Sequence, residues 1–96
     1  MEAINVKKLG DATFTVSVQG GRPTTHVVTV DPAYAARLTG NRVPVERLVS
    51  RSFEFLLERE PNTSILSRFD LSVIPHYFSE YERTILSWTE SMEPMK

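Results

Sequence analysis

The residues whose types and spacing come closest to a chemical site are His76, Glu80 and Asp70. One imidazole and two carboxylates can bind a divalent metal ion, and a histidine beside a carboxylate can transfer a proton. Pro75 and a helix start at Ser79 interrupt the chain here, so His76 and Glu80 are not expected to share one helix face. Their spacing matches no recognised zinc motif. We therefore expect no metal and no cofactor at this position.

Other routes to catalysis also lack the necessary partners. The chain has no cysteine, which excludes disulfides, thiolate zinc sites and cysteine nucleophiles. His26 lies beside a hairpin turn, where we expect it to be structural or exposed. The "QGGRP" stretch joins two strands and lacks the lysine of a phosphate-binding loop, so a hairpin turn explains it better. With no nucleophile and base to pair, the sequence predicts a protein that is not an enzyme.

A second group consists of arginines near the middle of the chain, at Arg37, Arg42, Arg47 and Arg51. Arginines gathered on a helix-turn-helix could contact the phosphates of a nucleic acid. The net charge of -1 gives no general attraction to phosphate, and the segment "DLSVIPHYF" offers few groups that read base edges. A nucleic-acid-binding regulator that uses Arg37–Arg51 is therefore the alternative hypothesis.

A third group is suited to binding another protein, and contains Arg59, Tyr77, Tyr81 and Trp88. Aromatic residues and arginine are enriched at the energetic centres of interfaces. The aromatics can equally form the core, and Arg59 at a helix end can satisfy terminal carbonyls or a carboxylate such as Asp70. Both readings stay open for these four residues.

The elements that must position these residues begin with strands. Phe14, Val16 and Val18 alternate with threonine and serine, which is typical of a strand with one buried face. The preceding Ile4 and Val6 and the following Val28 and Val30 repeat the alternation, with turns at Gly10-Asp11 and Gly20-Gly21. We predict a three-stranded antiparallel meander over about residues 3–30.

Helices are predicted over residues 32–90. Asp31 and Pro32 are suited to starting a short helix, and residues 45–60 form the strongest helical pattern, apolar over more than half its circumference. Pro61 ends that helix. Asn62, Thr63 and Ser64 can accept hydrogen bonds from the amides of a following turn, and Asp70 and Ser79 start further helical pieces. A last helix reaches about Glu90, and residues 91–96 are predicted to fray.

Composition fits this arrangement. The chain has 96 residues, of which 41% are apolar and 24% charged, as in ordinary globular domains. Chains of this length form one core. We predict a single α+β domain over residues 1–96, in which the meander packs against three to four helices. No long apolar run suggests a signal peptide or a membrane span, so a cytoplasmic location is expected.

The segment from Phe53 to Glu82, "FEFLLEREPNTSILSRFDLSVIPHYFSEYE", resembles a group of small bacterial proteins of unassigned function. The threonine- and valine-rich hairpin precedes it in the same order. This resemblance implies a bacterial, cytoplasmic and non-enzymatic protein, although Ser79 stands where the group often has proline.

These observations favour a small cytoplasmic protein-interaction or regulatory module without catalytic activity. It would bind a protein partner or a second copy of itself, with Arg59, Tyr77, Tyr81 and Trp88 as candidate interface residues. No interaction with a membrane is expected.

Overall fold

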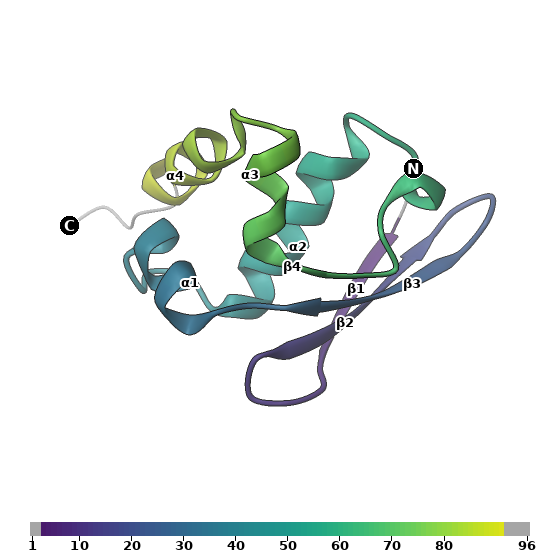
Figure 1. Cartoon of the computed structure of the whole chain (residues 1–96), viewed down its shortest axis with the longest axis horizontal. Coiled ribbons are helices and arrows are strands. Elements are labelled where there is room, and N and C mark those ends of the chain that lie inside the picture. The colour runs from purple at the N-terminus through teal and green to yellow at the C-terminus, as the bar shows by residue number, and fades with distance from the viewer. Residues whose placement is uncertain (1–2, 92–96) are drawn as a thin grey trace.

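A computed structural model describes residues 3–91 of the chain as an α+β fold. Its sheet contains β1 (Ala3–Lys8), β2 (Thr13–Gln19), β3 (Thr24–Thr29) and β4 (Arg68–Asp70), in the order β1-β2-β3-β4 (Figure 1). The first three strands pair antiparallel, which confirms the predicted meander. β4 was not predicted. It pairs parallel with β3, placing Phe69 beside Val28.

The alternation along the strands separates two faces of the sheet. Phe14, Val16 and Val18 are buried, and each neighbouring threonine or serine of β2 is more exposed. On β3, His26 and Val28 share the buried face, with His26 only 2% exposed. The helices lie over this face and beyond one end of the sheet (Figure 1). The opposite face is left to the polar residues of the strands.

The two longer predicted helices of the middle region are present. α1 spans Pro32–Thr39, where the Asp31 carboxylate accepts a hydrogen bond from the Ala33 amide at 3.0 Å, and Gly40 ends it with a φ of 62°. These are the roles expected of aspartate at the start and glycine at the end of a helix. α2 spans Val45–Leu57 and packs on β1. It occupies the centre of the domain, as predicted, and ends slightly earlier than Glu60.

After α2 the chain turns sharply several times. The short helical turns are η1 (Asn62–Ser64) and η2 (Leu71–Val73), followed by α3 (Ile74–Tyr77) and α4 (Tyr81–Ser91). The Asp70 carboxylate caps η2 by accepting from the Ser72 amide at 3.0 Å, as predicted. Of the predicted frayed tail, residues 92–96 lie outside the described part of the chain.

One apolar core joins the sheet to the helices. Among residues 3–91 it contains 19 buried side chains, contributed by β2, β3, β4, η2, all four α-helices and the connections at Val30 and Ile65, while Ile4 and Val6 of β1 are partly buried against it. Fully buried Phe53 is near its middle, with its ring centroid 5.3 Å from that of His26 and 6.0 Å from that of Phe69. Within residues 3–91, no helix has the length and apolar character needed to cross a membrane.

Candidate functional site

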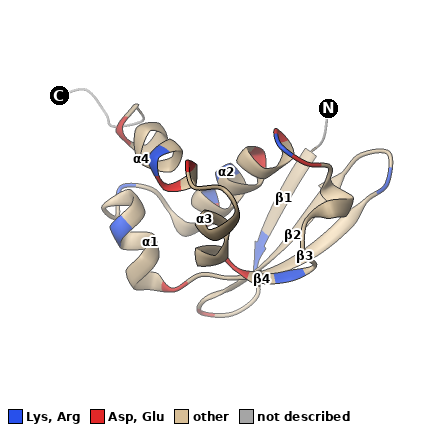
Figure 2. Cartoon of the chain, turned by 45° about the horizontal axis from the view of Figure 1, so that its top comes forward, with Lys and Arg blue, Asp and Glu red and all other residues tan. Residues whose placement is uncertain are grey.

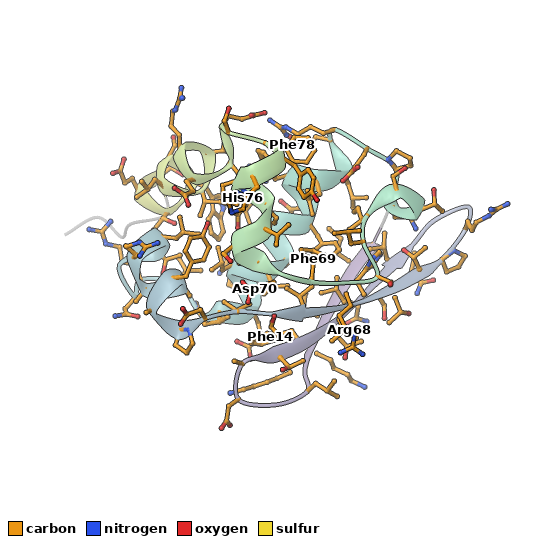
Figure 3. The ribbon with its side chains drawn as sticks, viewed as in Figure 1. Phe14, Arg68, Phe69, Asp70, His76 and Phe78 are labelled. Atoms are coloured by element: carbon orange, nitrogen blue, oxygen red, sulfur yellow. The ribbon has the colours of Figure 1, made fainter. Side chains whose placement is uncertain are left out.

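An apolar groove of about 220 Å³ opens between the end of α2, the η1 segment, β4 and α3. Its floor and walls are formed by Leu56, Ile65, Phe69, Val73, Ile74 and Phe78. Phe69 is the middle residue of β4, and Phe78 follows the end of α3 (Figure 3). The segment that stops and restarts helices after α2 thus also lines this apolar groove.

Two apolar side chains stand at the mouth of the groove with much of their surface in water. Leu66 is 52% exposed and Tyr77 is 70% exposed, and both line the groove. Single exposed apolar residues are common on protein surfaces, but these two continue the apolar lining of the groove onto the surface and form one exposed apolar patch with it.

A chain of hydrogen bonds holds the η1 wall of the groove against β3. Asn62 donates from Nδ2 to the Arg22 carbonyl and to Thr24 Oγ1, each at 2.8 Å. His26 Nδ1 lies 2.8 Å from the Leu66 carbonyl, which can only accept, so Nδ1 carries a proton. In the neutral ring, Nε2 then accepts from Thr24 Oγ1 at 2.9 Å. Asn62, Thr24 and His26 therefore each have a hydrogen-bond partner in this network.

The role of Asn62 differs from the one predicted. It was expected to accept from the amides of a following turn, but its amide group donates to Arg22 in the β2–β3 connection and to Thr24 at the start of β3. η1 is preceded by Pro61 and has no side-chain cap. The sequence pattern could not reveal this, because the partners Arg22 and Thr24 are distant in the chain.

Replacing Asn62 with alanine should test this attachment. Asn62→Ala leaves the Arg22 carbonyl unpaired and removes the donor to Thr24, so we expect a loss of about 2 kcal/mol of unfolding free energy. Denaturant titration measures the loss. Thr63→Ala, at the exposed neighbouring position, is the matched control and should change stability by less than about 0.5 kcal/mol. Equal effects of the two substitutions would contradict the assigned role.

Arg59 fixes the end of α2 next to the groove. Its Nη1 donates to the Phe55 carbonyl at 3.0 Å, and its guanidinium carbon lies 3.7 Å from the centroid of the Phe55 ring. Nε donates to the Glu80 carboxylate at 3.0 Å. A backbone hydrogen bond at Glu80 and the Arg59 guanidinium lower the pKa of that carboxyl. The predicted structural role at the helix end is confirmed, with Glu80 as the carboxylate in place of Asp70.

Glu60 is the one acidic residue among those lining the groove. Within residues 3–91 its carboxylate has no hydrogen bond and no ion pair, whereas nearby Glu58 and Glu80 both pair with Arg59. Figure 2 shows the acidic and basic residues at the end of α2 and the start of α4. The groove therefore combines an apolar interior with a single unpaired negative charge.

The other candidate interface residues lie in different surroundings. Tyr81 is fully buried, and its Oη lies 2.6 Å from Ser52 Oγ, so it belongs to the core. Trp88 is half-buried on α4, packed against the core and outside the groove. Of the predicted interface residues, Tyr77 lines the groove and Arg59 lies beside it.

The four arginines of the alternative hypothesis lie on α1, on α2 and on the connection between them. The Arg37 guanidinium carbon lies 5.4 Å from the centroid of the Tyr34 ring. Arg51 pairs with Glu54 at 3.8 Å, as their spacing in a helix predicts. Arg42 and Arg47 are exposed, and each has an interaction of its own.

His76, Asp70 and Glu80 are not brought together. His76 is exposed on α3, Asp70 lies at the start of η2, and Glu80 pairs with Arg59 (Figure 3). Among the described residues, no three histidine, aspartate or glutamate side chains are placed to hold a metal ion. None of these three residues lines the groove.

Sequence reasoning did not find the groove. Its mouth is formed by Leu66 and Tyr77, which come from separate turns of the chain. The one available signal was Leu66 itself, a large apolar residue that lies with Ile65 between two serines in a stretch of short turns. Comparison with known protein families, with curated proteins and with solved structures finds no match for this chain.

Proposed function

We propose that this chain is a small protein-interaction module without catalytic activity, and that it binds other protein at the groove. The observation that carries the proposal is the pairing of an apolar hollow with two exposed apolar side chains, Leu66 and Tyr77. A pocket filled by an apolar side chain of the partner is the usual energetic centre of an interface.

The size and lining of the groove favour this function over small-molecule binding or catalysis. Pockets for small ligands usually have about 300–1,000 Å³ and enclose most of the ligand. The groove has about 220 Å³ and is open to solvent. Its polar groups are Glu60, Ser64 and the Tyr77 hydroxyl, a set without a nucleophile next to a base.

The setting we propose is the bacterial cytoplasm, supported by the resemblance of the Phe53–Glu82 segment to small bacterial proteins. A regulatory role would follow if occupation of the groove controls a partner. The nucleic-acid alternative predicts a salt-sensitive gel shift with duplex DNA, lost on replacing Arg37 and Arg47.

Crosslinking inside cells tests the proposal. A photoreactive phenylalanine analogue is placed at Tyr77, or at Leu86 as the control, which is 44% exposed on α4 and outside the groove. We expect a defined protein adduct at position 77 at least fivefold above that at position 86. The adduct should disappear when Ile74→Asp, which puts a charge into the groove, is added to the same chain.

Equal adducts at positions 77 and 86, or none at either, would refute the groove as a protein-binding site. Because Ile74 is 3% exposed, its replacement can also unfold the protein. Leu66→Asp, at a half-exposed position on the same groove, is therefore measured in parallel, with circular dichroism of each variant.

A further inference from the structure

We propose that the groove receives Leu9 of a second copy of this chain, so that copies associate head to tail. This inference rests on the proposed function and names the partner. Leu9 is 66% exposed and follows two lysines, Lys7 and Lys8. It therefore joins an exposed apolar side chain to positive charge, the combination that complements the groove.

Leu9 is held in a position suited to insertion. It lies in the connection between β1 and β2, which projects from the molecule on the side of the sheet away from α3 and α4 (Figure 1). The amides of Leu9 and Gly10 both donate to the Thr13 carbonyl, at 2.8 and 3.1 Å. These bonds order the turn before binding, which lowers the entropy lost on association.

The groove matches this side chain in size and chemistry. About 220 Å³ is room for one bulky aliphatic group, and Leu66 and Tyr77 at the mouth would be covered as it enters. The unpaired Glu60 carboxylate would face the ammonium group of Lys8, which is exposed. Pairing removes the cost of leaving Glu60 unpaired against an apolar surface.

The geometry of the contact sets the form of assembly. The inserting residue and the receiving groove are different surfaces of the same chain, so the contact is heterologous and produces rings or open chains. One side chain in one groove buries much less than a stable interface of about 1,200–2,000 Å². We expect a weak association, with a Kd of about 0.1–1 mM.

Complementary variants test the proposal directly. Leu9→Ser keeps the groove and lacks the inserting leucine, while Tyr77→Ser together with Leu66→Ser keeps Leu9 and lacks the groove walls. Wild-type protein should form species larger than a dimer near 1 mM in analytical ultracentrifugation, and each variant alone should be monomeric. A mixture of the two variants should give a 1:1 complex that grows no further, since each copy retains one partner surface.

A charge exchange tests the expected pair of Lys8 and Glu60. Lys8→Glu should weaken association about tenfold, and Glu60→Lys in the same chain should restore it. Lys7→Glu, on the neighbouring residue, is the control and should weaken association less than twofold. All substituted positions are wholly or partly exposed, so folding should be retained, as circular dichroism will verify.

Other outcomes would overturn the inference. A wild-type monomer at 1 mM, or variants that still dimerise alone, would show that copies do not associate through Leu9. A photocrosslink from Tyr77 to a foreign protein, together with a wild-type monomer, would overturn this inference and leave the proposed function standing. Loss of all crosslinks at Tyr77 would instead refute the proposed function.

Discussion

Phe53→Ala is expected to lower the unfolding free energy by about 3–5 kcal/mol, the cost of deleting a large aromatic side chain from a core. Phe53 is fully buried on α2, with its ring against His26 and Phe69. Because the whole domain is stabilised by about 5–15 kcal/mol, the variant should be largely or partly unfolded near 40 °C. Chemical denaturation followed by circular dichroism measures the change.

Two control substitutions show whether the loss of stability comes from the buried position and volume of Phe53. Leu86→Ala removes an apolar side chain from an exposed site on α4, 44% accessible, and should cost less than about 0.5 kcal/mol. Phe53→Leu keeps most of the volume and should cost less than Phe53→Ala. A loss below about 1 kcal/mol for Phe53→Ala would show that α2 is not the centre of the packing.

The second large effect is destabilisation at alkaline pH, caused by Tyr81. Burial raises the pKa of Tyr81 well above its ordinary value of about 10. Ser52 Oγ donates to the Leu48 carbonyl at 2.7 Å, so the Tyr81 hydroxyl must donate to Ser52. Ionisation would remove that donor and leave a buried anion. Burial and a hydrogen bond to Glu82 also raise the pKa of Tyr34.

The sign of the pH dependence follows from the raised pKa. The folded state keeps its proton at a pH where the unfolded chain has lost it, so the stabilisation is complete below about pH 10 and is lost as the pH rises further. Each pH unit above 10 should cost about 1.4 kcal/mol for Tyr81, with a further loss from Tyr34. Denaturant midpoints measured from pH 7 to pH 12 give this slope.

Tyr81→Phe separates the ionisation from other effects of alkali. At pH 7 the variant loses one hydrogen bond and about 1 kcal/mol. Its stability should fall less steeply above pH 10, so that the difference from wild type shrinks and then reverses. Parallel curves for the two proteins up to pH 12 would show that the Tyr81 hydroxyl is not buried.

Sequence patterns predicted the elements with a strong local signal. The alternation of Phe14, Val16 and Val18 gave the buried face of β2, and Asp31 and Asp70 both cap the helical turns that follow them. The apolar pattern of residues 45–60 gave α2 and its central place. These features depend on neighbours within a few residues, which is the range over which periodicity and capping act.

The missed features depend on contacts between distant segments. β4 has three residues, too few for an alternation to be recognised, and it exists because Phe69 fits the core beside Val28. Asn62 has local partners available in principle, yet it donates to Arg22 and Thr24. Tyr77 and Tyr81 are tyrosines separated by only three residues, and packing alone exposes the first and buries the second.

The amino-acid sequence by itself therefore determined the α+β class, the three-stranded meander and the helix starts at Asp31 and Asp70. Backbone conformation and the burial of one face of an element depend on residues close together in the chain, so the local sequence pattern predicts them. The groove, its unpaired Glu60 and the exposure of Leu66 and Tyr77 were decided by the tertiary structure. Packing brings together four segments that share no local pattern, and the surface left uncovered appears only when all of them are in place.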